Sequence, residues 1–158
     1  MMIPLNPELD LELTRLMSAP PAKVWRCWTE PALLKLWFTP KPVVTRHAEI
    51  DLRPGGRFFT LLVLPDGTEM PNDGSFLEVV PQQRLTFTDT LLAGFRPTAI
   101  PGLGFTAIIT LAPEGSGTRY TARALHRDPA GRKAHADMGF HDGWGTAATQ
   151  LDAVAMGL

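Results

Sequence analysis

The sequence has very little cysteine: Cys27 is the only one among 158 residues. A single cysteine excludes an intramolecular disulfide and a cysteine-based zinc site.

The sequence also lacks an excess of charge of one sign. Fifteen Lys and Arg stand against 16 Asp and Glu, a formal net charge of −1, which excludes the basic footprint of a protein that binds nucleic acid or an anionic membrane.

Long apolar runs are absent as well. The longest nearly apolar stretch, residues 58–64, is far shorter than the roughly 20 residues that span a bilayer. The first ten residues contain no basic region followed by an apolar one, so we expect no signal peptide and a cytoplasmic protein.

The composition that remains is that of an ordinary globular domain, with 44% hydrophobic and 20% charged residues. The length predicts one domain over residues 1–158, with a core from about 9 to 157. A chain of this size buries roughly 70% of its unfolded surface, so it folds without covalent cross-links.

The N-terminal residues predict a half-buried strand. Leu9, Leu11 and Leu13 alternate with polar residues, and a period of two is typical of a strand with one face in the core. Arg15 continues the apolar parity, so its guanidinium is expected to point inward at the end of the strand.

Two short helices should follow. Pro21 suits the first turn of a helix, and Val24 and Trp28 recur at helical spacing. We expect Thr29 to cap a second helix that has Pro31 in its first turn.

Residues 43–126 show the pattern of an antiparallel meander. Val44, Ala48, Ile50 and Leu52 share one parity and predict one apolar strand face, and turn signals such as the Asp-Gly pair at residues 66–67 separate the strands. No helical pattern separates the strands, which favours antiparallel pairing. The expected strands are residues 44–52, 57–64, 75–80, 84–89, 105–111 and 119–126.

Residues 132–155 predict a long helix with an apolar stripe. Gly139, Gly143 and Gly145 weaken this prediction, because each costs about 1 kcal/mol against Ala inside a helix. Either the helix begins near Thr146, or its first turns press closely on a strand or a ligand.

Six short motifs in a fixed order carry a resemblance to a known family. They are residues 15–28 (RLMSAPPAKVWRCW), 29–40 (TEPALLKLWFTP), 49–58 (EIDLRPGGRF), 74–88, 117–119 (GTR), and 141–144 (HDGW) followed by Leu151. Together they resemble the START-like (SRPBCC) superfamily, in its branch of homologues of the activator of the heat-shock protein 90 ATPase, similar to that activator's C-terminal domain.

The resemblance implies an α+β helix-grip fold. A curved antiparallel sheet of about six or seven strands would wrap around the long C-terminal helix, with two short helices after the first strand and a cavity between sheet and helix. The sequence departs from the family pattern at residues 91–104, which are longer and more apolar than expected, and in the link of residues 127–138.

Aromatic side chains are the first candidates for a cavity wall. Trp25, Trp28, Trp37 and Trp144 would serve equally well as core, and Trp37 with Phe38 is the best candidate for partial exposure. The residues expected to bind a ligand are Arg15, Trp37, Phe38, Phe59, Phe87, Asp89, Phe105, Tyr120, His126, Phe140, His141 and Trp144. The alternative is a cavity filled by Phe58, Phe59, Phe87, Phe105 and Trp144.

Polar groups inside the cavity would supply any chemistry. Strand parity turns Tyr120, His126 and Asp89 inward, and Asp137 would lie beside His141 at i, i+4 of a helix. The catalytic candidates are therefore His126, His141, Asp89 and Asp137. Mutual hydrogen bonding among these groups would account for them equally well.

Metals and cofactors are not expected. The four histidines, at positions 47, 126, 135 and 141, lack the i, i+4 spacing of paired helical ligands. Dinucleotide and phosphate-loop motifs are absent. We expect Cys27 to be a small buried residue.

Three functions stay open. The first is binding of a small hydrophobic or amphipathic molecule, lipid-like or aromatic. The second is a cyclase- or dehydratase-like enzyme that uses a cavity histidine with an acidic partner, which rests on analogy of fold. The third is a co-chaperone that contacts a heat-shock chaperone, which exposed aromatic residues in the 91–104 loop would favour. Because two-fold dimers are the commonest protein assemblies, we also expect a homodimer.

Overall fold

A curved antiparallel sheet and a long C-terminal helix form the molecule, as expected for the helix-grip fold. The computed structural model describes residues 3–99 and 102–158. Seven strands pair in the order β1-β9-β8-β5-β4-β3-β2, and a separate two-stranded hairpin contains β6 and β7. The strands are β1 (Asp10–Met17), β2 (Val44–Ile50), β3 (Arg57–Val63), β4 (Glu69–Val80), β5 (Arg84–Thr88), β6 (Leu91–Leu92), β7 (Arg96–Pro97), β8 (Phe105–Glu114) and β9 (Gly117–His126). The helices are α1 (Pro21–Thr29), α2 (Pro31–Leu34), α3 (Pro129–Asp137) and α4 (Phe140–Met156).

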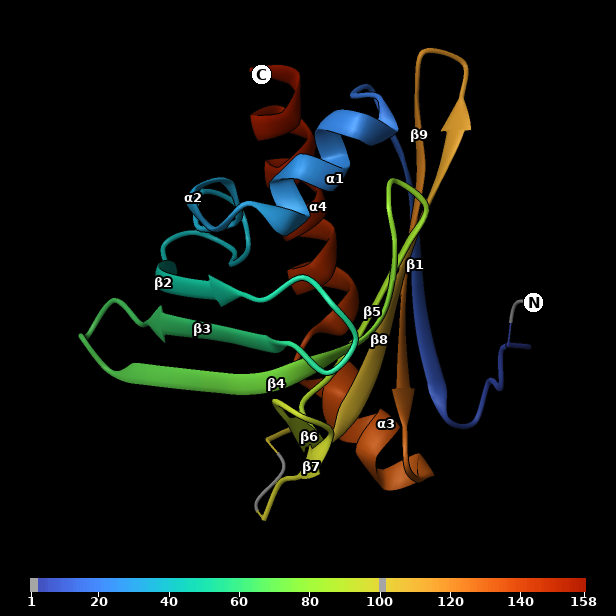
Figure 1. The fold of residues 1–158 in the computed structure, drawn as a ribbon. Coiled ribbons are helices and arrows are strands. Elements are labelled where there is room, and N and C mark those ends of the chain that lie inside the picture. The colour runs from blue at the N-terminus through green and yellow to red at the C-terminus, as the bar shows by residue number, and fades with distance from the viewer. Residues whose placement is uncertain (1–2, 100–101) are drawn as a thin grey trace.

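The sheet is bent, and α4 lies in the bend. Figure 1 shows β2, β3 and β4 running across the helix while β1 and β9 run along it, with α1 and α2 over one end. A β-bulge between Phe76 and Glu78 interrupts the pairing of β4 with β5, and a bulge increases local bending and twist. Gly74 permits the close approach at this corner, because a Cβ there would lie 2.3 Å from the carbonyl oxygen of Thr88.

Small residues bring α4 close to the sheet and to α1. Ala148, Leu151 and Ala155 of the helix are buried, as are Ala122 and Ala124 of β9. Short side chains on α4 let its backbone approach those of α1 and β1, and the alanines of β9 belong to the same core.

A carboxylate of α4 holds the segment between β1 and α1. The two carboxylate oxygens of Asp152 accept hydrogen bonds from the backbone N–H groups of Ser18 and Ala19, each at 3.0 Å. These N–H groups precede α1, so Asp152 fixes the position of α1 relative to α4.

The C-terminal helix differs from the prediction of one helix over 132–155. It is two helices, because Gly139 adopts a left-handed conformation with φ of 90°. The first helix begins at Pro129, where Asp128 accepts a hydrogen bond from the N–H of Gly131 at 2.8 Å. The second begins at Phe140, well before Thr146, and Gly143 and Gly145 lie within it.

Two local predictions were also wrong. Thr29 does not cap α2: its hydroxyl donates to the carbonyl of Trp25 at 2.8 Å, and Glu30 is the N-cap residue. Val44 is exposed, because a bulge between Thr45 and His47 reverses the parity of β2 and turns Thr45 into the core.

The unusual segment of residues 91–104 folds back on the sheet. The N–H of Gly94 donates to the carbonyl of Gly55 at 2.8 Å, and the ring of Phe95 covers Gly55. Residues 100 and 101 of this segment lie outside the described residues. Within the described ranges, the helices are all too short or too polar to cross a membrane.

Candidate functional site: an aromatic cavity beside α4

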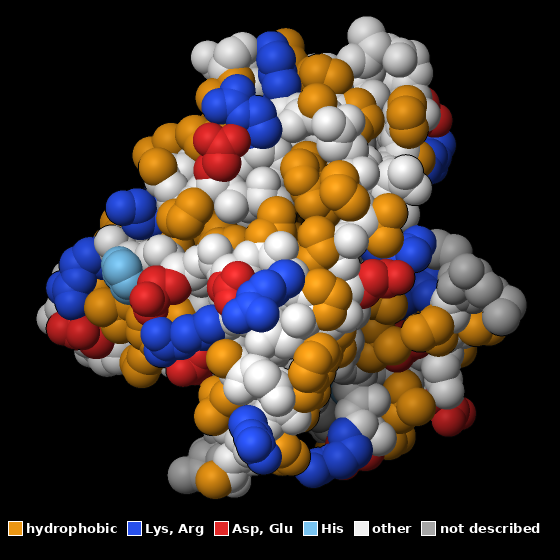
Figure 2. Space-filling view, viewed as in Figure 1, with side chains coloured by type: hydrophobic (Ala, Val, Ile, Leu, Met, Phe, Trp, Pro, Cys, Tyr) orange, Lys and Arg blue, Asp and Glu red, His pale blue; other side chains and the backbone are white. Residues whose placement is uncertain are grey.

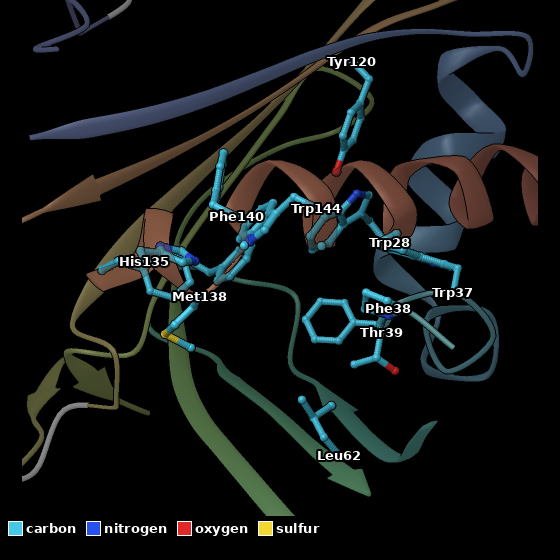
Figure 3. Close-up of a pocket in the computed structure, with 16 residues that line it drawn as sticks. Trp28, Trp37, Phe38, Thr39, Leu62, Tyr120, His135, Met138, Phe140 and Trp144 are labelled. Atoms are coloured by element: carbon cyan, nitrogen blue, oxygen red, sulfur yellow. The ribbon is translucent and has the colours of Figure 1, made fainter. Parts of the chain in front are cut away.

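A cavity of about 340 Å³ lies between the start of α4, the segment after α2 and the inner face of the sheet. Figure 3 shows His135 and Met138 on one side of this cavity and Trp28, Trp37 and Phe38 on the other. Met138 is 72% exposed, so the cavity opens at the junction of α3 and α4. Its lining residues are Trp28, Trp37, Phe38, Thr39, Pro40, Leu62, Phe87, Phe105, Tyr120, His135, Met138, Gly139, Phe140, Gly143, Trp144 and Ala147.

One wall contains rings that we call the tryptophan cluster: Trp28, Trp37, Phe38 and Phe87, which line the cavity, and Phe58, which packs on Phe38 and Phe87 without lining it. The ring centroid of Trp28 lies 4.9 Å from that of Trp37 and 5.7 Å from that of Phe87. The indole N–H of Trp37 donates to the carbonyl of Cys27 at 3.0 Å. These contacts are edge-to-face or tilted, the favoured geometry for aromatic pairs, so the wall is rigid.

The opposite wall, the histidine cluster, consists of Phe105, His135, Phe140 and Trp144. The His135 ring lies 4.9 Å from Phe105 and 5.1 Å from Phe140, measured between centroids. Phe140 also lies 5.1 Å from Trp144. Among the described residues, no ring contact joins this cluster to the tryptophan cluster, so the cavity separates two aromatic walls.

A glutamine of α4 holds the segment that carries Trp37 and Phe38. The Gln150 amide nitrogen donates to the carbonyls of Trp37 and Thr39, at 2.9 and 2.8 Å. Its oxygen accepts from the N–H of Lys41 at 3.1 Å. Three backbone hydrogen bonds from one side chain fix the distance between this segment and α4, and with it the width of the cavity.

Polar atoms in the tryptophan cluster are few and deeply buried. The Trp28 indole N–H has no hydrogen-bond partner among the described residues, although Figure 3 shows it facing the Tyr120 hydroxyl. Burial raises the pKa of Tyr120, and the nearby Trp28 indole opposes that shift only in part. The phenol is therefore neutral at physiological pH, and its oxygen faces the buried indole N–H of Trp28.

The polar atoms of the histidine cluster form a chain into the protein. Nε2 of His126 lies 2.9 Å from Nδ1 of His135, and Nδ1 of His126 lies 2.8 Å from the Leu9 carbonyl oxygen. Both imidazoles are only 6% exposed. Burial, with a smaller contribution from His126, lowers the pKa of His135 to about 4. In the part of the chain that the structure describes, no three potential ligands gather into a metal site.

The fold has counterparts among known proteins. The family described as Activator of Hsp90 ATPase homolog 1-like protein matches residues 18–156. The chain belongs to this family.

Solved structures of similar proteins support this assignment. A protein from Nitrosomonas europaea is 50% identical, with a TM-score of 0.91 over 95% of this chain and 96% of its own. A protein from Mycobacterium smegmatis is 25% identical, with a TM-score of 0.79 over 95% and 92% of the two chains. An AHSA1-like protein from Aeromonas hydrophila shares the fold, at 19% identity and a TM-score of 0.70 over 94% and 93%. The search among curated proteins gave no match. The START-like fold of this family supports a ligand-binding domain in general terms.

Seven of the twelve residues that we expected from the sequence to bind a ligand line this cavity. They are Trp37, Phe38, Phe87, Phe105, Tyr120, Phe140 and Trp144. The aromatic residues leave space between them, so the cavity is not filled as the alternative reading required.

Arg15 and Phe59 lie elsewhere. Arg15 is exposed, donates to the Thr14 carbonyl at 3.1 Å and lies against Gly145 at the edge of α4. Phe59 belongs to the outer face of β3, where the Arg57 guanidinium lies 4.4 Å from its ring centroid. Figure 2 shows acidic and basic side chains side by side over β2–β4, and Arg57 pairs there with Asp73. Phe59 therefore lies on the same face of β3 as Arg57, which points away from the cavity.

The acidic candidates are occupied by other partners. Asp89 accepts from the N–H groups of Gly104 and Phe105, at 3.1 and 3.0 Å, and so closes the 91–104 loop. Asp137 pairs with Lys133 at 2.5 Å. The break at Gly139 rotates His141 away from Asp137 and leaves it exposed, so the predicted i, i+4 pair does not form.

His135, and not His126, is the histidine that lines the cavity. His126 faces inward as its parity predicts, but it lies behind His135 and does not line the cavity. The sequence reasoning treated His135 only as a metal candidate. The signal was the Asp128-Pro129 pair, which starts α3 immediately after β9 and folds His135 back over the end of that strand.

Proposed function

We propose that this chain binds one small, uncharged and largely apolar molecule in the cavity beside α4. The observation that carries the proposal is the pair of facing aromatic walls around about 340 Å³ of space. Pockets for small organic ligands start at about 300 Å³ and are lined mainly by apolar and aromatic side chains.

The charge of the ligand follows from the lining residues. None of the residues that line the cavity is Asp, Glu, Lys or Arg. A buried ion without a partner is strongly disfavoured, so a charged group would have to remain at the opening near Met138. The flat, rigid rings favour an aromatic or alicyclic body over a long flexible chain.

The other functions have less support from the residues around the cavity and on the 91–104 loop. An acid–base pair needs a carboxylate beside an imidazole, yet among the described residues no carboxylate lies within 4 Å of His126 or His135. A chaperone-binding surface would need an apolar patch of several hundred Å². Phe95 is the one aromatic residue of the 91–104 loop, and its half-exposed ring already packs on Gly55.

Native mass spectrometry of the purified protein, followed by denaturing extraction, tests the proposal. We expect a stoichiometric small molecule, or recovery of binding when a panel of uncharged aromatic compounds is added. Ala147→Trp fills the cavity and should abolish binding, because Ala147 lines it. Ala153→Trp is the matched control, since Ala153 lies on the exposed side of the same helix.

Equal occupancy of both variants would contradict the proposal, as would a wild-type protein that binds nothing in the panel. Circular dichroism and a thermal melt of each variant would first establish that both are folded.

A further inference from the structure

The proton positions in the two buried histidines can be read from their hydrogen bonds. A carbonyl oxygen only accepts, so the short contact with Leu9 requires a proton on Nδ1 of His126. A neutral His126 then carries a lone pair on Nε2. That lone pair must accept from Nδ1–H of His135, and Nε2 of His135 is left unprotonated.

The opposite arrangement requires a charged imidazolium at His126, which would donate from both ring nitrogens. Both rings are buried, and a buried cation needs a counter-ion. Within residues 3–99 and 102–158, no carboxylate lies within salt-bridge distance of either ring. The aromatic neighbours of His135, Phe105 and Phe140, carry no charge. The lowered pKa of His135 agrees with a neutral pair.

The free nitrogen of His135 lies on the side of the ring away from His126. The two nitrogens of an imidazole point to different sides of the ring, and the Nδ1 side is turned to His126. His135 lines the cavity whereas His126 does not. Nε2 of His135 makes no hydrogen bond with any described residue, so an acceptor is presented to whatever enters.

We propose that Nε2 of His135 is the polar anchor of the cavity, held unprotonated by His126 and Leu9, and that the bound molecule carries an uncharged hydroxyl or N–H donor. This inference rests on the proposed function and names the chemical class of its ligand. Phenols, alcohols and indole-type N–H groups satisfy the acceptor. A carboxylate does not, because its oxygens would face the lone pair without a proton between them.

Matched probes test the anchor: 2-naphthol, its methyl ether 2-methoxynaphthalene, and 2-naphthoate. These share one ring system and differ in the donor and the charge. We expect wild-type protein to bind 2-naphthol about tenfold more tightly than the ether, since the ether leaves the buried acceptor unpaired. Binding of 2-naphthoate at pH 7 should be the weakest of the three.

Three variants assign the preference to its residues. His135→Phe should bind 2-naphthol and the ether equally. His141→Phe, an exposed histidine at the start of α4, should keep the tenfold preference. His126→Phe should reduce the preference although His135 is still present, because nothing then holds the His135 proton on Nδ1; His126 is thus a positioning residue.

The ¹⁵N spectrum of the histidine rings gives a readout that needs no ligand. It should show an unprotonated Nε2 in His135 at pH 7, and the signal should change in His126→Phe. A protonated Nε2, or equal binding of 2-naphthol and its ether by wild type, would overturn the anchor and leave the apolar cavity standing. Failure of all three probes to bind would overturn both the anchor and the proposed function.

Discussion

The two walls of the cavity are built in different ways. In the tryptophan cluster, rings pack on rings, and Trp28 contacts three others within 6.0 Å between centroids. In the histidine cluster, rings surround a polar pair that leads back to the backbone of Leu9. One wall therefore consists of packed rings, and the other contains a buried pair of imidazoles.

Because of this difference, we expect one wall to contribute most to the free energy of unfolding and the other to determine how that free energy depends on pH. The tryptophan cluster, in which large rings are packed together, should dominate the free energy of unfolding, because burial of large rings is the main stabilising term in a core. The wall that contains the histidine pair should dominate the pH dependence, because it holds titratable groups in an apolar setting. Substitutions at the two ends can test this separation.

The largest effect is expected at the tryptophan cluster. Trp28 is 2% exposed, and Trp28→Ala should lower the free energy of unfolding by about 3–5 kcal/mol through loss of buried surface and an enlarged cavity. Trp144→Ala in the histidine cluster should cost less, because Trp144 is only half-buried. Urea unfolding followed by far-ultraviolet circular dichroism measures both, and equal losses would contradict the comparison.

The second effect belongs to the histidine cluster and is a dependence on pH. Burial lowers the pKa of His135 from 6.5 to about 4. Between these values the unfolded chain binds a proton at His135 that the folded chain does not, so the free energy of unfolding falls as the pH falls through this window. The loss is up to ~3 kcal/mol, and it is absent above the window.

Two glutamine variants isolate this contribution. His135→Gln removes the titrating group while its amide can still donate to His126, so the slope between pH 6.5 and 4 should flatten. His141→Gln should keep the wild-type slope, since His141 is exposed. Chemical denaturation repeated across this pH range provides the measurement, and parallel curves for His135→Gln and wild type would refute the assignment.

The order of elements could be predicted because local signals and global topology agree. Alternation in residues 9–13, the Asp-Gly turn and the apolar stripe of α4 each specify their own element. Details that depend on contacts between elements could not be predicted. The bulge at Thr45 changes which face Val44 occupies, and no local pattern marks a bulge.

The candidate site shows the same limit. Aromatic residues such as Phe87 and Trp144 were predicted from parity and helical spacing, and these survive because each lies within a regular element. The polar candidates failed where the chain breaks regularity: the left-handed Gly139 separates Asp137 from His141. His135 was missed because its importance arises from contact with His126 across two elements, β9 and α3.

The smallest effect concerns the two glycines of α4, which lies along both walls. Gly143→Ala should raise the free energy of unfolding by about 1 kcal/mol, because a Cβ there meets nothing within 4 Å. Gly145→Ala should gain less, because its Cβ would lie 2.8 Å from Nη2 of Arg15 and would displace that side chain. Adding Arg15→Ala should restore the full gain at Gly145 while leaving the gain at Gly143 unchanged, which a double-mutant cycle of thermal unfolding measures. Equal gains in both single variants would show that Arg15 yields without cost, and that the close packing at Gly145 does not constrain α4.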